Sequence, residues 1–166
     1  NETVTEGDAG TQPMTFTVNM SAVVDANVSF NFATANGTAS APTDFGSAGG
    51  SVTWVPGVIT GTLTILINGD CTIEPNEVFT MVLSALNANG RNVTFSPAGS
   101  TLSGTGTINN EDFLPVITFC PANVTINCQD STAPANTGQA TATDDCPGVL
   151  VTSADITVGG NCVNNY

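Results

Sequence analysis

The side chains in this sequence that are able to do chemistry are mostly acids. Fourteen Asp and Glu residues face a single base, Arg91, and the chain has no Lys and no His. At most one carboxylate can therefore have a cationic side chain as its partner. The other carboxylates must either be spread out and hydrated or be held together by bound metal cations. The positions of the acids along the chain bear on this choice.

Seven of the ten acids before Pro115 lie at predicted strand ends or in turns, namely Glu6, Asp44, Asp70, Glu74, Glu77, Glu111 and Asp112. In a β-sandwich such turns can meet at one end, where unneutralised charges repel by roughly 1 to 4 kcal/mol per pair. Calcium takes about six to eight oxygen ligands from carboxylates, carbonyls and water, so it suits such a cluster. The residues alone also allow a plainer interpretation, in which surface acids keep a secreted protein soluble.

The scarcity of basic residues argues against several functions. Nucleic acids and anionic lipid surfaces need cationic partners, which a chain with one Arg does not supply. No apolar run approaches the roughly 20 residues of a membrane span. A Ser or Cys nucleophile needs a base, so only a carboxylate pair remains for catalysis. We therefore expect no enzyme, no nucleic-acid binding and no membrane insertion.

Apolar and polar residues alternate with a period of two through the first 112 residues, which predicts β-strands. The apolar faces fall within residues 14–20, 28–32, 63–67 and 79–83, with weaker strands at 52–54 and 102–108. Turn sequences such as Asn36-Gly37 and Asn89-Gly90 separate them. About seven short strands of this kind predict an all-β fold, an antiparallel, immunoglobulin-like β-sandwich.

A second unit is expected after the first. Cysteine content rises and aromatic residues become scarce beyond Pro115, so we place one domain at residues 1–114 and another at 115–166. Strands are expected near 116–119, 122–128, 139–143 and 149–157. The second unit is short for a sandwich, and we expect a smaller, incomplete β module.

Five cysteines point to disulfides rather than to zinc. Four of them, Cys120, Cys128, Cys146 and Cys162, lie in the second unit, and the chain has neither a CxxC pair nor a His. Dense cysteine in a weakly cored segment is typical of an oxidising, extracellular setting. Cys71 lies within the acidic turn 68–77, where it is either a free thiol or bonded to a neighbouring unit or chain.

Motifs along residues 2–113 carry a family resemblance. They are Thr5-Glu6-Gly7-Asp8, Gly37-Thr38-Ala39 with Thr43-Asp44-Phe45, Val55-Pro56-Gly57, Gly69-Asp70 with Glu74-Pro75-Asn76-Glu77, and residues 108–112. This pattern resembles the Calx-beta domain, a calcium-binding sandwich of sodium–calcium exchangers, an integrin β subunit and bacterial surface proteins. The resemblance implies Ca²⁺ ligands at Glu6, Asp44, Asp70, Glu74, Glu111 and Asp112, with Glu77 and Asn110 ranked lower.

Two departures from the family pattern reduce the number of anionic ligands. Gly69 stands where the exchanger pattern has consecutive aspartates, and Asn110 replaces one acid of the closing triplet. Fewer carboxylates imply fewer ions and weaker binding. We expect one or two structural calcium sites with an affinity suited to extracellular calcium.

The second unit is similar to hyalin-repeat-like modules of bacterial surface proteins, through 120–125, Cys128 and 141–146. That resemblance implies an immunoglobulin-like fold with a role in adhesion or spacing. The pairings preferred with it are Cys128 with Cys146 and Cys120 with Cys162, although four cysteines allow three connectivities. Asp144 and Asp145 form either a solvated turn or a second cation site.

These resemblances together lead us to expect a calcium-binding structural or adhesive segment of a secreted, multi-repeat bacterial surface protein. Calcium would stiffen the joint between modules. The expected partners are neighbouring modules, other copies of the chain, or surface glycans and proteins. Two alternatives stay open: an adhesin module that binds a glycan or protein directly, and a self-assembling extracellular fibre subunit.

Overall fold

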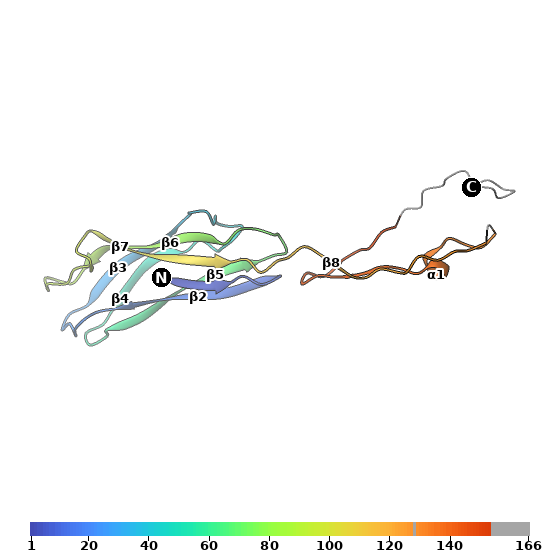
Figure 1. The fold of residues 1–166 in the computed structure, drawn as a ribbon. Helices are drawn as coiled ribbons and strands as arrows, with labels where there is room; N and C mark the ends of the chain where they lie inside the picture. Colours follow the sequence, from blue (N-terminus) through green and yellow to red (C-terminus); the bar gives the residue numbers. More distant parts are fainter. Residues whose placement is uncertain (128, 154–166) are drawn as a thin grey trace. The chain divides into compact units, whose positions relative to one another are not determined.

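A computed structural model describes residues 1–127 and 129–153 of the chain (Figure 1). The chain divides into two compact units, with the division between Asp112 and Phe113. The sequence-based boundary was placed two residues later, after Leu114. Each unit has its own sheet structure, and the first contains the predicted sandwich.

The first unit is built from seven strands, β1 (Glu2–Thr5), β2 (Gly10–Asn19), β3 (Val28–Ala35), β4 (Gly49–Trp54), β5 (Thr60–Gly69), β6 (Glu77–Asn87) and β7 (Thr101–Asn109). Five form one sheet in the order β1-β7-β6-β3-β4, and β2 pairs with β5 in the other. The predicted all-β sandwich is confirmed. One pairing is not antiparallel, because β1 runs parallel to β7.

The core of the sandwich follows the period-two pattern. Met14, Ile65 and Phe79, from both sheets, are each no more than 2% exposed. The ring of Phe79 stacks on that of Phe45 with centroids 4.3 Å apart, and the ring of Phe16 meets Phe79 edge-on at 6.1 Å. Truncating a buried aromatic of this kind costs about 3–5 kcal/mol, so this layer holds the two sheets together.

Strand pairing brings several turns to the same end of the sandwich. Thr5 is paired with Asn109, so β1 and β7 finish together. The antiparallel pairing of Glu77 with Ile108 starts β6 at that same end. In the other sheet Gly10 pairs with Gly69, which places the start of β2 beside the end of β5. The segments that follow or precede these strand ends contain most of the acids singled out above.

The second unit has little regular structure among its described residues. β8 (Val116–Phe119) pairs antiparallel with β9 (Thr141–Thr143), and α1 (Pro134–Thr137) is a single turn. The predicted strand 122–128 is wrong over its described part, 122–127, where no strand forms and Val124 is 53% exposed. Among the described residues no second sheet covers this segment, so its alternating pattern has no face to bury.

The helix α1 was not expected from the sequence. It begins at Pro134, where the missing N–H costs nothing, and ends at Thr137, followed by the capping residue Gly138 with a φ of 94°. Residues 149–153 contain no strand, and the rest of the predicted strand 149–157 lies outside the described residues, as do Cys128 and Cys162. Within the described ranges, no helix has the length and apolar character of a membrane span.

Candidate metal centre

The acids at the shared end of the sandwich form one cluster around Glu6. Glu6 follows β1, its N–H donates to the carbonyl of Asn109 at 3.2 Å, and its side chain is only 5% exposed. Burial, together with the nearby charges of Asp70, Glu111, Glu74 and Asp112, raises the pKa of Glu6 to about 7. The structure therefore brings together acids from three separate turns.

The closing residues of the first unit supply the least hydrated carboxylates of this cluster. Asp112 is 6% exposed. Both carboxylate oxygens of Glu111 are buried and have no hydrogen-bond partner among the described residues. A buried carboxylate without hydrogen bonds or a counter-charge costs several kcal/mol, so these oxygens fit a bound cation.

A second group of carboxylates adjoins the first. The side chains of Asp44, Glu74 and Glu77 each place an oxygen within 4.8 Å of the others. Burial, followed by hydrogen bonding to Asp44, raises the pKa of Glu77. Burial also raises the pKa of Glu74, with the charges of Asp44, Asp70 and Asp112 adding to the effect. Glu74 thus connects the two groups into one acidic centre.

Asp44 is held in place by local hydrogen bonds. Its Oδ2 accepts from the N–H of Ser40 at 2.6 Å. The side-chain amide of Asn68 donates to the carbonyls of Pro42 and Thr43 at 2.7 Å each, which ties the Asp44 turn to the end of β5. Asn68 was not singled out from the sequence. Its position directly before Gly69-Asp70 was the only feature of the sequence that could have indicated its role in the acidic turn.

Asn110, ranked low as a ligand, is used to position its neighbours. Its Nδ2 donates to the carbonyl of Glu74 at 2.9 Å, and its N–H donates to Oδ1 of Asn76 at 3.1 Å. Its Oδ1 accepts from the N–H of Asp112 at 3.0 Å. Asn110 therefore fixes two carboxylate-bearing segments against each other, while a direct role as a ligand stays a prediction.

Comparison with protein families matches residues 1–112 to the Calx-beta domain. This chain belongs to the Calx-beta family. The match covers all seven acids of the cluster and ends where the second unit begins. The hyalin-repeat resemblance of the second unit and a bacterial source stay predictions.

Solved structures of Calx domains are similar to this Calx-beta chain. CBD12 from CALX1.2 aligns with a TM-score of 0.54 and 26% identity, over 65% of this chain and 40% of that one. The apo form of Calx CBD1 aligns with a TM-score of 0.51 and 25% identity, over 66% of this chain and 89% of that one. The calcium binding domain CBD12 of CALX1.1 aligns with a TM-score of 0.54 and 25% identity, over 74% of this chain and 49% of that one. The chain thus spans less than half of the two CBD12 proteins, and no curated protein matches it in sequence.

The structure explains why this Calx-beta domain has Gly69 in its acidic turn. A Cβ at position 69 would lie 2.0 Å from the carbonyl oxygen of Gly7 and 2.8 Å from that of Glu6. No side chain fits there without moving the backbone, so an aspartate at this position is sterically excluded. The missing carboxylate thus coincides with a close contact between the backbones of two turns.

The cysteine pairing differs from the expected one. Cys71 and Cys146 form a disulfide, so the preferred pairing of Cys128 with Cys146 is wrong. The spacing of cysteines in a sequence does not determine which of them meet in space, and this is why the pairing was missed. Among the described residues Cys120 is an exposed free thiol, and its expected partner Cys162 lies outside them.

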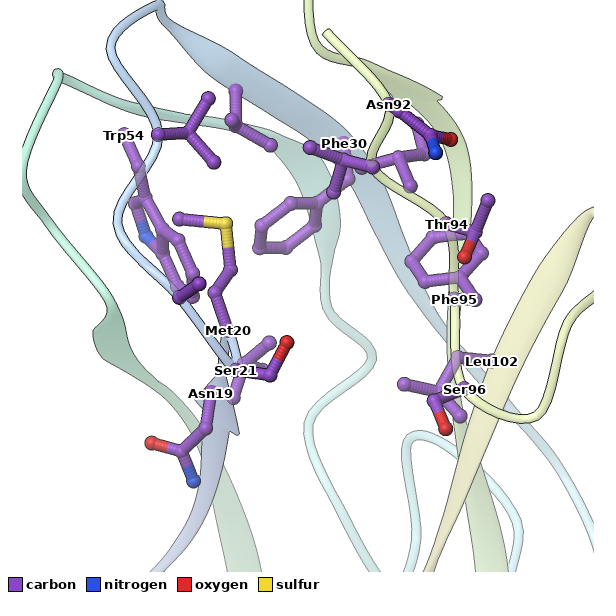
Figure 2. Close-up of a pocket in the computed structure, with 16 residues that line it drawn as sticks. Asn19, Met20, Ser21, Phe30, Trp54, Asn92, Thr94, Phe95, Ser96 and Leu102 are labelled. Carbon is purple, nitrogen blue, oxygen red and sulfur yellow. The ribbon is translucent and has the colours of Figure 1, made fainter.

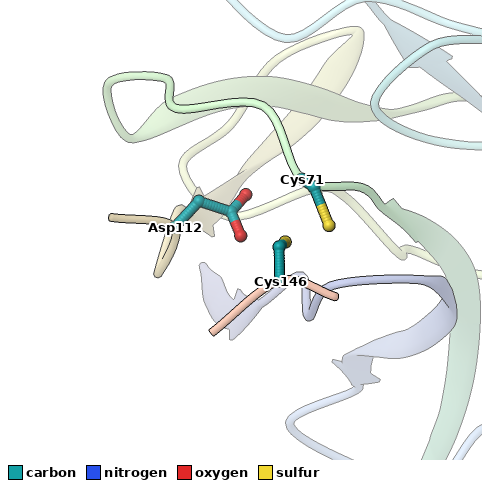
Figure 3. A group of neighbouring side chains, drawn as sticks. All are labelled: Cys71, Asp112 and Cys146. Carbon is teal, nitrogen blue, oxygen red and sulfur yellow. The ribbon is translucent and has the colours of Figure 1, made fainter. Parts of the chain in front are cut away.

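The disulfide also bears on metal binding. Figure 3 shows the Cys71 side chain near the carboxylate of Asp112, with Cys146 also drawn. Sulfur in a disulfide is not a thiolate, and it is the thiolate that binds metals. The ligands that this Calx-beta domain offers at this end are therefore oxygens.

Proposed function

We propose that this Calx-beta domain binds Ca²⁺ through Glu6, Asp44, Asp70, Glu74, Glu77, Glu111 and Asp112. The observation that carries the proposal is the buried carboxylate of Glu111, whose two oxygens have no hydrogen-bond partner among the described residues. It lies in a group of acids whose charges raise the pKa of Glu6. The similarity to a calcium binding domain of CALX1.1 supports the choice of ion.

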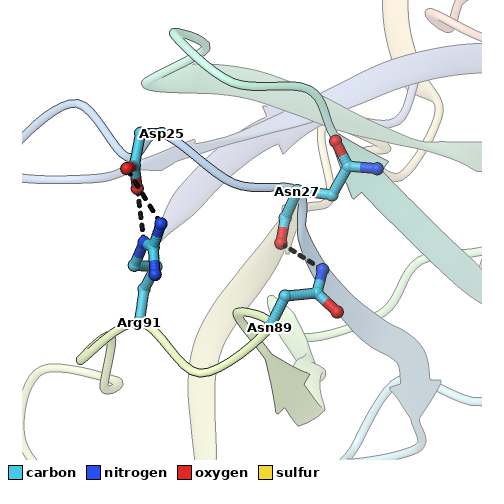
Figure 4. Close-up of polar contacts among 4 residues, drawn as sticks. All are labelled: Asp25, Asn27, Asn89 and Arg91. Carbon is cyan, nitrogen blue, oxygen red and sulfur yellow. Dashed lines mark hydrogen bonds and ion pairs between the residues drawn. The ribbon is translucent and has the colours of Figure 1, made fainter.

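No protein cation is able to neutralise this cluster. The only basic side chain, Arg91, follows β6, and its Nη2 donates to Oδ2 of Asp25 at 2.9 Å (Figure 4). Asp25 precedes β3, so this ion pair lies at the strand ends opposite to the cluster. Neutralisation at the acidic end must therefore come from protons or from a bound cation.

The donor set favours calcium over other cations. Every candidate ligand is a carboxylate or carbonyl oxygen on a turn or at a strand end, without His or thiolate, which argues against zinc. Turns from separate strands provide the irregular, many-oxygen coordination that calcium accepts, whereas magnesium requires a near-ideal octahedron.

We further propose a structural role, as a segment of a secreted, multi-repeat surface protein. Glu111 and Asp112 are the last residues of the first unit, and the next residue, Phe113, begins the second. An ion that holds these two carboxylates would fix the chain at the point where it leaves the sandwich. The disulfide between Cys71 and Cys146 is typical of an oxidising compartment and supports an extracellular location.

Limited proteolysis of the whole chain tests the structural role. Calcium at millimolar concentration is expected to slow cleavage between residues 110 and 116 by about tenfold or more, because only the folded, ion-bound state is protected. Magnesium at the same concentration serves as the control cation. Equal cleavage rates with and without calcium would contradict a role at the joint.

A second candidate function, a self-assembling fibre subunit, is favoured by strand β4. This strand lies at the edge of the five-stranded sheet, and Gly49–Trp54 contains neither a charged residue nor a proline. Natural sheet edges usually carry such protection against pairing with other chains. Calcium-dependent filaments in electron micrographs would support this candidate, while a monomer at all calcium concentrations would remove it.

A further inference from the structure

A cavity of about 330 Å³ lies at the end of the sandwich opposite to the acidic cluster (Figure 2). It opens where β2, β4 and β6 finish and where β3 and β7 begin, so both sheets contribute to its walls. The loops 20–24 and 92–96 form its mouth. Neither the acids of the metal centre nor any other charged residue lines it.

The inner wall of this cavity, which we call the end pocket, is apolar and aromatic. Phe30 and Trp54 meet edge-on with ring centroids 5.4 Å apart, and Phe95 faces them from the other side (Figure 2). Trp54 and Phe95 are each 8% exposed, and Phe30 is 3% exposed. Met20 also lines this wall. The three aromatic residues are therefore packed in the core and at the same time line the pocket.

The mouth of the end pocket is polar but uncharged. The polar residues that line the end pocket are all uncharged, namely Asn19, Ser21, Asn92, Thr94 and Ser96. A charged ligand would find no counter-charge there. Because the chain has a net charge of −13, an anion would in addition be repelled.

The two loops at this end are tied together. Arg91 forms its ion pair with Asp25, and Nδ2 of Asn89 donates to the carbonyl of Asn27 at 3.0 Å (Figure 4). These contacts join the segment before β3 to the segment after β6, which are the segments that carry the mouth. The end pocket is thus formed without a ligand, as ligand sites usually are.

Water is a poor occupant for the inner part of this space. A buried water needs about two to four polar partners, and the aromatic and aliphatic wall does not supply them. Apolar cavities take up apolar molecules instead, and a cavity of roughly 150 Å³ is large enough for benzene. The end pocket has about twice that volume, which is the size of a fused-ring or short-chain compound.

We propose that the end pocket is a binding site for a small uncharged molecule with an apolar body and a hydrogen-bonding edge. The body lies against Trp54, Phe30 and Phe95, and the polar edge faces the uncharged polar residues of the mouth. This site is independent of the acidic cluster, since the two lie at opposite ends of the sandwich. Binding therefore does not require calcium.

The sequence provides its own reporter for this binding. Trp54 is the only tryptophan of the chain, and it lines the end pocket. Titration of the whole chain with 1-aminoanthracene, a neutral fused-ring fluorophore, is expected to quench Trp54 emission and to raise the emission of the dye, with saturation at one dye per chain. The anion 1-anthracenecarboxylate is expected to bind about tenfold more weakly or worse.

Two matched variants locate the dye. Ala22→Phe adds a ring at a lining position and is expected to weaken dye binding about tenfold or more. Ala98→Phe adds the same ring at an exposed position that does not line the pocket, and it is expected to change the dye affinity less than twofold. If thermal unfolding shows that Ala22→Phe is not folded, Thr94→Phe closes the mouth from the facing loop and replaces it.

Three results would overturn the proposal. One is the absence of saturable quenching of Trp54. Another is equal affinity in the lining and the non-lining variant. The third is loss of dye binding on calcium removal in a protein that remains folded, because this would place the dye at the acidic end.

Discussion

The backbone of Gly69 packs directly against that of Gly7, so that a Cβ on residue 69 would lie 2.0 Å from the Gly7 carbonyl oxygen. This contact joins the turn after β1 to the end of β5. Glu6 and Asp70, the residues next to these two glycines, are acids whose charges act on each other. The close contact between the two turns thus brings the carboxylates of Glu6 and Asp70 near each other, and a bound cation would relieve their repulsion.

Replacing Gly69 by alanine is therefore expected to damage both the fold and the metal centre. The added methyl group forces the turns apart, and overpacking of this kind typically costs about 1–3 kcal/mol. Calcium affinity should fall as well, because the turns that carry Glu6 and Asp70 separate. Denaturant unfolding and calcium titration of Gly69→Ala measure the two effects.

Gly99→Ala is the matched control, since a Cβ there meets its nearest atom at an ordinary 3.5 Å. Its unfolding free energy should change by less than about 0.5 kcal/mol. Equal stability of the two variants would show that the turns do not approach each other as described.

Removing a carboxylate from the cluster should have opposite effects with and without calcium. In the metal-free protein, Asp70→Asn or Glu111→Gln relieves repulsion and is expected to raise the melting temperature. In calcium the same changes remove a ligand and should lower it relative to the wild type. Glu2→Gln, which removes one acid that contributes to none of these shifts, serves as the control. Melting curves recorded in EGTA and in calcium measure both effects. A shift in melting temperature of the same sign under both conditions would count against a metal site.

The metal-free protein should become more stable as the pH falls from 8 to 5. The pKa of Glu6 is about 7 in the folded protein against an ordinary value of 4.5, so the folded state binds the extra proton between these values. The stabilisation that comes from protonating Glu6 is then fully present below about pH 4.5 and is lost as the pH rises through 7. The raised pKa values of Glu74 and Glu77 act in the same direction.

Calcium should reverse this dependence, because protons compete with the ion for the same oxygens. Glu6→Gln should flatten the metal-free profile. Thermal unfolding at several pH values, with and without calcium, checks both statements. A metal-free protein that loses stability on acidification over this range would contradict the buried position of Glu6.

The cysteine pairing predicts a defined peptide map. Digestion without reduction should yield a peptide pair that links Cys71 to Cys146. Iodoacetamide should label Cys120 in the native, unreduced protein, because this thiol is exposed and free among the described residues. A linked pair that contains Cys120, or an alkylated Cys71, would show that the pairing is different.

The sandwich was predictable because each strand buries one face. The alternation at Met14 and Phe16, and again at Phe79 and Met81, marks residues that the two sheets share as a core. Burial of one face fixes the register of a strand, so period-two patterns are reliable wherever a second sheet covers them. In the described part of the second unit Val124 is 53% exposed, and there the same pattern predicted a strand that is absent over residues 122–127.

The clustering of the acids was predictable for a different reason. The acids lie in turns and at strand ends, and a chain with one basic residue cannot neutralise them with its own side chains. A bound cation was therefore one of the interpretations that remained. The residues that hold those acids in place were not predictable, because Asn68 and Asn110 act through hydrogen bonds to backbone atoms of distant turns. The Cys71–Cys146 pairing depends likewise on proximity in space, which spacing along the chain does not encode.

Calorimetric titration of the whole chain with calcium tests most directly whether the acidic cluster is a metal centre. We expect saturable binding of one or two ions to the wild type, and heats reduced to the level of dilution in an Asp44→Asn, Asp70→Asn double variant that remains folded. Binding heats that are the same in the wild type and in this variant would show that the converging carboxylates do not hold the ion.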